Sequence, residues 1–175
     1  MMKTYLSLMA AVVLLAACGG KSDKKADKKA AKAVETPALQ QNCKATNDTE
    51  IASLFDRWNN ALRTGKSENV VANYAPDSVL LPTLSNKVRY SVDEKKDYFN
   101  HFLAKAPVGE INERHIQIGC NTALDAGVYT FTFGKTGEKA TGRYSYTYQW
   151  DGKEWLITSH HSSLMPEQPT AKAAH

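Results

Sequence analysis

Two adjacent histidines, His160 and His161, are the first residues in this 175-residue chain whose types suggest chemistry. Neighbouring residues on a strand point to opposite faces of the sheet, so the two imidazoles cannot ligate one metal without a bulge. His161 shares its strand parity with Trp155 and Ile157, and we therefore predict that it faces inward. An inward imidazole can act as a general acid or base near neutral pH, which makes His161 the candidate catalytic residue. The alternative is a core histidine that is hydrogen-bonded to a backbone carbonyl or to Ser163.

The remaining histidines and the serine pair offer little further chemistry. His101 and His115 lie far from the histidine pair in sequence, and the spacing typical of metal ligands is not evident, so no metal site is predicted. Ser162 and Ser163 lie on an expected strand without the glycines of a nucleophile elbow, so a nucleophilic serine is not expected.

Aromatic and polar side chains are candidates for lining a ligand cavity. Tyrosines can serve this purpose, although an alternating pattern on strands is also what simple core packing produces. They are Tyr98, Tyr129, Tyr144, Tyr146 and Tyr148. Asn121 and Asp125 are further candidate pocket groups, but Asp125 precedes Ala126-Gly127, a sequence that favours a turn.

Helical periodicity dominates the first half of the expected domain. An Asn47 cap begins a helix whose apolar residues recur at helical spacing and which ends at Gly65. Caps at Ser67 and Ser91 begin two further helices, and residues 78–82 form a brief strand between these two helices.

Beyond Pro107 the hydrophobic period changes to two, which predicts strands. The expected strands are 110–119, 128–133, 141–150 and 154–164, and a hairpin turn at Asp151-Gly152 joins the last two. Helices that precede a meander of antiparallel strands define an α+β fold with the helices packed on one face of the sheet.

An aromatic stripe marks one face of the expected strand 141–150. It consists of Tyr144, Tyr146, Tyr148 and Trp150. Because the helices cover only one face of the sheet, the stripe implies that the second face is covered as well. A second copy of the domain is the expected cover, so we predict a homodimer.

The formal net charge of +4 is concentrated outside the expected domain. Residues 43–175 include 15 basic and 15 acidic side chains, whereas six lysines lie within residues 19–42. Binding of nucleic acid needs a concentrated basic face, and the neutral domain gives no sign of one. Nucleic acid is therefore not expected as a partner.

Residues 1–17 predict a signal peptide, because Lys3 precedes an apolar run that is shorter than the roughly 20 residues of a membrane-spanning helix. The run ends in residues 15–19 (LAACG), which resemble a bacterial lipobox with Cys18 as the lipidated residue. The alternative is an ordinary signal peptide with an incidental cysteine. Lipidation would place the protein in the cell envelope, anchored by its lipid and facing the periplasm. Gly19, the residue after the lipidated cysteine, permits sorting of the protein to the outer membrane in a bacterium that has two membranes.

Residues 18–45 lack apolar periodicity, and beyond Cys18 we expect a flexible, Lys/Ala-rich tether. The folded domain is expected over residues 46–167, and residues 168–175 are expected to be a disordered tail. Two cysteines remain for the domain, Cys43 and Cys120. An even pair in an exported protein usually forms a disulfide, and the alternative is two buried free thiols.

Three runs carry a resemblance to a known family. They are residues 73–83 (NYAPDSVLLPT), 142–148 (GRYSYTY) and 160–166 (HHSSLMP). They resemble the bacterial branch of the calcium/calmodulin-dependent protein kinase II association-domain family, over roughly residues 48–166. The resemblance implies a cone-shaped cystatin-like fold, also called SnoaL-like or nuclear-transport-factor-two-like, with N-terminal helices on a curved antiparallel sheet. It also implies oligomerisation and a pocket, without a kinase domain.

The same resemblance suggests which residues face the cone pocket. In the kinase members, arginines from three strands point into it, and this chain has Tyr129 or Thr130, Ser145 and Ser162 at those positions. Arg143 is the one nearby arginine. The predicted ligand-pocket residues are Trp58, Tyr98, Asn121, Tyr129, Arg143, Ser145 and His161.

Two functions remain open at this point. The first, which we prefer, is a non-enzymatic, membrane-anchored homodimer that binds a small ligand or an envelope protein in its pocket. The second is a SnoaL-like enzyme with His161 as acid or base: an isomerase, a dehydratase or an oxidoreductase of the SgcJ/EcaC type. A Gly-rich dinucleotide loop is not evident, and no cofactor is predicted. Fold alone cannot choose between the two.

Overall fold

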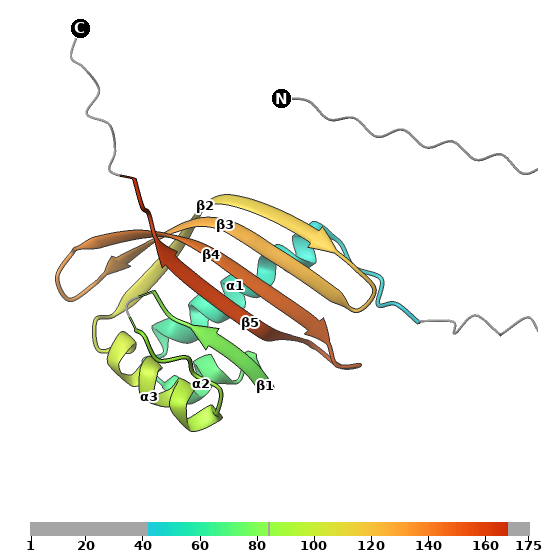
Figure 1. Ribbon diagram of the computed structural model, residues 1–175, viewed down its shortest axis with the longest axis horizontal. Coiled ribbons are helices and arrows are strands. Elements are labelled where there is room, and N and C mark those ends of the chain that lie inside the picture. Colours follow the sequence, from blue (N-terminus) through green and yellow to red (C-terminus); the bar gives the residue numbers. More distant parts are fainter. Residues whose placement is uncertain (1–41, 84, 168–175) are drawn as a thin grey trace, which may run out of the picture. The chain divides into compact units, whose positions relative to one another are not determined.

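The computed structural model describes residues 42–83 and 85–167, which form three helices and five strands (Figure 1). The elements are α1 (Asp48–Arg63), α2 (Ser67–Val71), β1 (Tyr74–Leu81), α3 (Val92–Leu103), β2 (Pro107–Ile118), β3 (Thr122–Phe133), β4 (Lys139–Trp150) and β5 (Trp155–Leu164). The predictions for residues 1–17, for Cys18 and for residues 168–175 lie outside the described residues, as does most of the expected tether.

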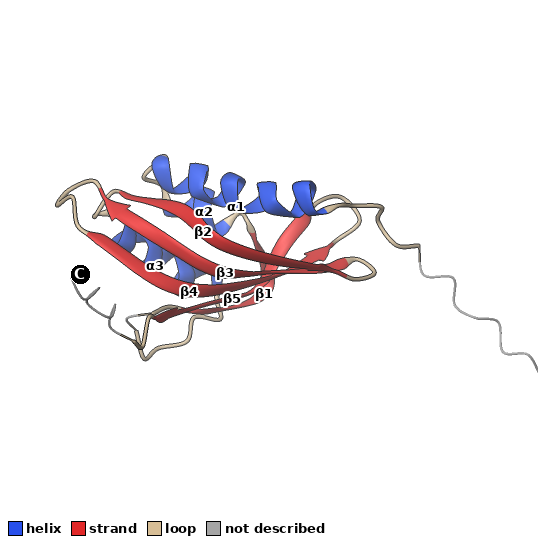
Figure 2. Ribbon diagram, turned by 90° about the horizontal axis from the view of Figure 1, so that it is seen from above, coloured by secondary structure: helices blue, strands red, loops and turns tan. Residues whose placement is uncertain are grey.

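The strands form one mixed sheet in the order β1-β5-β4-β3-β2. Strands β2 to β5 make the predicted antiparallel meander, and Figure 2 shows α1 and α2 along one face of the curved sheet. The predicted α+β architecture, with helices on one face of a curved sheet, is thus confirmed. The prediction of a purely antiparallel sheet is wrong at one edge, where β1 pairs parallel with β5. These two strands lie far apart in the chain, so no local turn signal announces their pairing.

Capping contacts begin the helices where the sequence predicts them. The Asn47 side chain accepts a hydrogen bond from the Glu50 backbone N–H at 2.9 Å, which satisfies one free donor of α1. Ser91 and Glu94 form a complete capping box at the start of α3. Gly65 follows the end of α1 with a φ of +66°, a conformation in which glycine carries no steric cost.

The core lies between α1 and the inner face of the sheet. Trp58 of α1 packs edge-on against Tyr146 of β4, with ring centroids 5.8 Å apart. Tyr144 and Tyr148 are buried on the same face. The prediction that this aromatic stripe needs a second copy as its cover is therefore wrong, because the helices of the same chain cover it.

A buried amide holds α1 against the sheet. The Asn59 side chain donates a hydrogen bond from Nδ2 to the Gly109 carbonyl at 2.8 Å and accepts one at Oδ1 from the Gly109 N–H at 2.9 Å. Both backbone groups of a β2 residue are thereby satisfied inside the core, so this contact fixes the position of α1 across β2.

A β-bulge in β2 explains why residue 127 of β3 is a glycine. The pairing with β3 shifts between Ile111 and Glu113. The shift brings the Glu113 carbonyl oxygen to 1.9 Å from the place that a Cβ at Gly127 would occupy. Only glycine fits at this position, where the bulged backbone approaches so closely.

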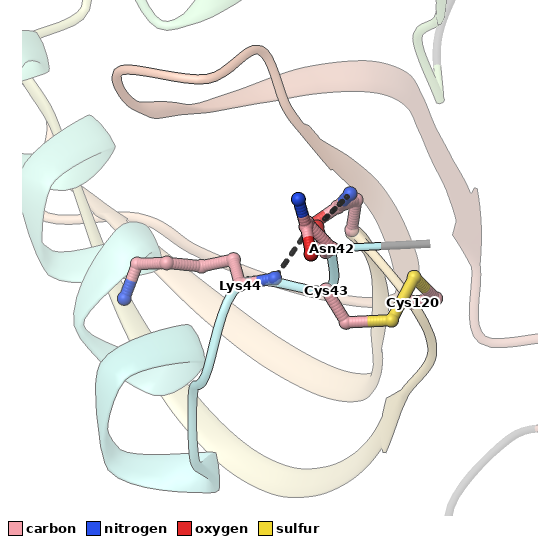
Figure 3. The surroundings of a disulfide bond; sticks show 5 residues. Asn42, Cys43, Lys44 and Cys120 are labelled. Carbon is pink, nitrogen blue, oxygen red and sulfur yellow. Dashed lines mark hydrogen bonds between the residues drawn. A yellow bond between two sulfur atoms is a disulfide. The ribbon is translucent and has the colours of Figure 1, made fainter. Parts of the chain in front are cut away.

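The predicted disulfide between Cys43 and Cys120 is present and joins residues 77 positions apart (Figure 3). Beside it, Asn121 Oδ1 accepts a hydrogen bond from the Lys44 N–H at 2.7 Å, and Asn121 Nδ2 donates to the Asn42 carbonyl at 3.2 Å. We call this group the clasp. It ties the segment before α1 to the β2–β3 turn, so Asn121 serves here and does not lie in the pocket predicted for it.

Across the described ranges, 42–83 and 85–167, no helix has the length and apolar character needed to span a membrane.

Candidate functional site

A cavity of about 250 Å³ lies between α3 and the neighbouring ends of β3, β4 and β5. Its inner wall consists of buried side chains: Trp58, Leu80, Phe99, Tyr129, Phe131, His160 and Ser162. Its mouth is formed by exposed residues: His101, Lys105, Ala140, Thr141 and Leu164. Mostly apolar walls with a few placed polar groups are typical of small-molecule sites.

A β-bulge in β5 decides which histidine enters this cavity. The pairing with β4 passes from Tyr148–Ile157 to Thr147–Ser159, which leaves Thr158 as the extra residue. The alternation of faces reverses after the bulge. His160 is therefore buried, with 4% of its surface exposed, whereas His161 is exposed. The prediction that His161 faces inward is wrong for this reason.

His160 is held by a chain of hydrogen bonds that crosses the core. Trp58 Nε1 donates to Tyr74 Oη at 3.1 Å, and Tyr74 Oη lies 2.7 Å from His160 Nδ1. An indole N–H can only donate, so Tyr74 Oη accepts there. The buried hydroxyl proton of Tyr74 then has His160 Nδ1 as its acceptor. The imidazole also stacks on Tyr146, with ring centroids 4.1 Å apart.

This chain sets the tautomer of the ring. With Nδ1 accepting from Tyr74, the neutral imidazole carries its proton on Nε2. His160 Nε2 is buried and has no hydrogen-bond partner among the described residues. Burial, with a smaller contribution from His161, lowers the pKa of His160 to about 3. At neutral pH the ring is therefore uncharged, and it is a poor general base.

Three hydroxyl groups form a second polar row on the cavity wall. Tyr129 Oη donates to Ser162 Oγ, and Ser162 Oγ shares a further hydrogen bond with Thr83 Oγ1. Burial raises the pKa of Tyr129 above its ordinary value, and it raises the pKa of Tyr98 to about 12. Both phenols are therefore neutral at physiological pH, and they offer hydrogen bonds and ring surface rather than charge.

The structure brings three of the predicted pocket residues to the cavity and leaves four elsewhere. Trp58, Tyr98 and Tyr129 line it. Asn121 lies in the clasp. The other three lie on the outer face of the sheet, which carries Arg143, Ser145 and His161.

The outer-face placement of these three residues follows from strand alternation. Arg143 and Ser145 alternate with the buried tyrosines of β4, and Arg143 Nε donates to Ser163 Oγ at 3.1 Å. His161 pairs with Ser145 on the neighbouring strand. The expectation that these residues point into the cone pocket is wrong, because the inner face is already occupied by the aromatic stripe.

Several lining residues were not predicted. Ser162 had a signal, because the resemblance aligned it with a pocket arginine of the kinase members. His160 was visible as half of a histidine pair, and only the bulge at Thr158 selects it. Thr83 and Lys105 lie outside the helices and strands, where hydrophobic periodicity gives no indication.

Asp125 belongs to a separate buried network. It lies within β3 and is fully buried, so the predicted turn at this position is wrong. Tyr144 Oη donates to Asp125 Oδ1 at 2.8 Å, and Arg114 Nε lies 3.2 Å from the carboxylate. Burial raises the pKa of Asp125, while the tyrosine and the guanidinium favour its charged form. The network is not part of the cavity wall, and it ties β2, β3 and β4 together.

Within residues 42–83 and 85–167, no three His, Cys, Asp or Glu side chains gather as metal ligands would.

Comparison with known proteins identifies the family. The calcium/calmodulin dependent protein kinase II association domain matches residues 47–166, so the chain belongs to this family. No curated protein matches the chain. A solved structure from Xanthomonas campestris, whose name proposes such an association domain, is 44% identical. It matches with a TM-score of 0.66 and covers 75% of this chain and 100% of its own.

Two more distant structures share the fold alone. A Nostoc punctiforme protein of unknown function with a cystatin-like fold has a TM-score of 0.61 and 16% identity, over 74% of this chain and 98% of its own. A Streptomyces avermitilis protein of the NTF2-like family, whose name proposes a dehydratase, has a TM-score of 0.58 and 13% identity. It covers 68% of this chain and 96% of its own.

The lowered pKa of His160 predicts how stability depends on pH. The unfolded state binds a proton at this ring near pH 6.5, whereas the folded state binds it only near pH 3. Acid therefore favours unfolding through this group, and its contribution is complete above pH 6.5 and lost as the pH falls toward 3. We expect the free energy of unfolding to lose about 2 kcal/mol through His160 between pH 7 and pH 5.

Urea denaturation of the wild type and of His160→Gln at both pH values measures this loss. The carboxylates titrate alike in both proteins, so the difference between them isolates His160. The stability gap should change by about 2 kcal/mol between the two pH values. A gap that is independent of pH would show that the ring is not buried in its neutral form.

Proposed function

We propose that this protein is a lipid-anchored protein of the cell envelope whose folded domain binds a small, largely apolar molecule in the cavity. The observation that carries the proposal is the cavity itself, with its mostly aromatic and aliphatic walls. An apolar cavity of about 150 Å³ is enough to bind benzene. About 250 Å³ therefore has room for one ring and a short substituent.

The lipobox-like residues 15–19 support the anchor, with Cys18 as the acylated residue. The clasp lies at the β2–β3 turn, next to Thr122, where β3 begins. The cavity is lined by Phe133, at the other end of the same strand. Twelve residues of strand span roughly 40 Å, at about 3.3 Å each. The cavity mouth thus lies at the end of the sheet opposite to the point where the anchored segment joins the domain.

The anchor is tested by the Cys18→Ser variant in the producing bacterium. We expect the wild type in the membrane fraction and the variant in the soluble fraction of the envelope, because acyl chains supply the stable attachment. Equal membrane retention of both proteins would contradict lipidation at Cys18.

The second part of the proposal is a homodimer, which forms through the outer face of the sheet. Half-buried apolar residues of β3 lie there, among them Leu124, Ala126 and Val128. The name of the family, an association domain, also supports self-association. The aromatic stripe plays no part, since it lies inside the chain.

A charge at the centre of the outer face tests the dimer. Ser145 pairs with Ala126 on one side and with His161 on the other. Ser145→Arg should convert the dimer to a monomer in sedimentation equilibrium at micromolar concentration, because two buried arginines would face each other across the interface. Thr136→Arg, in the exposed β3–β4 turn, is the matched control and should remain dimeric. A monomeric wild type would contradict the proposal.

An enzyme is the second candidate, and one observation favours it. His160 lines the cavity, and a neutral imidazole whose Nε2–H reached a bound substrate would polarise its carbonyl without acting as a base. The catalytic residue of this alternative would be His160 and not His161. Turnover of a bound compound, abolished in His160→Gln with binding retained, separates this alternative from simple binding.

Filling the cavity tests ligand binding. Ala140 lines the mouth, whereas Lys139 is exposed and precedes it on the opposite face of β4. The ¹⁹F signal of fluorobenzene should broaden on addition of the wild type or of Lys139→Trp, but not of Ala140→Trp, in which the indole occupies the mouth. Equal broadening by both variants would show that the probe binds elsewhere, and no broadening by the wild type would contradict an accessible cavity.

A further inference from the structure

The outer face of the sheet carries acidic side chains on β2. Arg114 reaches Asp125 in the core, so its neighbour Glu113 points outward. Glu110 pairs with Thr130, an outward residue that lies between two buried aromatic residues of β3, and it therefore points the same way. Both glutamates are exposed, and neither forms an ion pair within residues 42–83 and 85–167. The β2 side of this face is therefore negative.

The β4 side of the same face is positive. The outward residues of β4 alternate with its buried tyrosines, and Lys139 and Arg143 are the charged ones among them. Arg143 Nε donates to Ser163 Oγ at 3.1 Å, and the other guanidinium nitrogens can donate to a further acceptor. β3 lies between the two charged strands, and its outward residues are uncharged: Thr122, Leu124, Ala126, Val128, Thr130 and Thr132.

The backbone pairing places these charges symmetrically about β3. Val128 is the partner of Glu113 on β2 and of Arg143 on β4, so the two charges lie in one row on opposite sides of β3. Neighbouring strands are about 4.8 Å apart, so both residues are equally far from β3. Glu110 lies in the row between those of Lys139 and Arg143. A twofold axis along β3 therefore places the acidic strand of one copy opposite the basic strand of another.

We propose that the homodimer is built about a twofold axis that runs along β3, with Glu113 of each copy paired to Arg143 of the other. This inference rests on the proposed homodimer and adds the position of its axis and the residues that select it. The half-buried Leu124, Ala126 and Val128 of the two copies pack against each other on the axis. Every contact of such an interface occurs twice, so two ion pairs flank this apolar strip. The strands of the two copies run in nearly the same direction, as in aligned packing of sheets.

Other axes through the same face match the charges poorly. An axis along β4 would place the two copies of Arg143 opposite each other, and an axis along β2 would do the same for Glu113. An axis across the strands would place β2 on β2 and β4 on β4, which gathers like charges. Like charges that face each other in an interface disfavour that arrangement, so the pattern selects the axis along β3.

Charge reversal tests this axis. Glu113→Arg and Arg143→Glu each convert two attractive pairs of the dimer into two repulsive ones. We expect each variant to raise the dissociation constant about hundredfold at low salt, about tenfold for each of the two pairs. Sedimentation equilibrium measures this constant on the full chain with Cys18→Ser in every sample, so that no acyl chain contributes to association.

An equal mixture of the two variants shows whether the pair joins two copies. In a mixed dimer each pair again joins an arginine to a glutamate, so mixed dimers should form in large excess over either homodimer, as counted by native mass spectrometry. The double variant Glu113→Arg/Arg143→Glu should dimerise as the wild type does. If the double variant recovers but the mixture does not, the two charges act within one chain and the inference is wrong.

Glu68→Arg and Lys66→Glu are the matched controls. Both residues are exposed at α2, in the helical layer and away from the outer face, and the same reversals of charge there should leave the dissociation constant unchanged. An equal loss of dimer in these controls would show an effect of net charge alone, and it would overturn the inference.

The outcomes distinguish this inference from the proposed function. A monomeric wild type would contradict the proposed homodimer and the inference together. A wild-type dimer that Ser145→Arg dissociates, but that neither Glu113→Arg nor Arg143→Glu weakens, uses this face with a different axis. The proposed homodimer would then stand, and the inference would fail.

Discussion

The hydrogen-bond chain from Trp58 through Tyr74 to His160 is the contact on which the rest of the account depends. It joins α1, β1 and β5, so it forms only when the parallel edge strand is in place. The indole N–H can only donate, so the phenol accepts from it and donates its own proton to the imidazole. The chain thereby fixes the orientation and the tautomer of an imidazole that lines the cavity.

The contacts around this chain keep the cavity open. α1 is fixed to β2 by the Asn59 amide, and the clasp holds the preceding segment to the far end of the same sheet. α3 packs against the sheet through Phe102, which contacts Phe131 edge-on with centroids 5.3 Å apart. The cavity is therefore a gap bounded by rigid aromatic groups, which suits binding without a large rearrangement.

The sequence predicted the local features well and the non-local ones poorly. Three local predictions were confirmed: the caps at Asn47 and Ser91, the apolar stripe of α1 and the Cys43–Cys120 bond. Each of these features leaves a signal in composition or spacing, and for that reason the sequence could predict it. The bulge at Thr158 leaves no such signal, because it arises where β5 meets both β4 and β1. Because of that single extra residue, His160 lies on the inner face of the sheet, where the sequence had predicted His161. The aromatic stripe was predicted, but the sequence could not show whether it lies on the face of the sheet that the helices cover, because that depends on tertiary packing.

Imidazole ¹⁵N NMR measures the protonation state of His160 directly. Long-range ¹⁵N–¹H correlation spectra at pH 7 distinguish a ring protonated at Nε2 from one protonated at Nδ1 or at both nitrogens. We predict a neutral ring with its proton on Nε2, unchanged down to about pH 5 because the pKa of His160 in the folded state is about 3. A ring protonated at Nδ1, or a charged imidazolium at pH 7, would contradict the account.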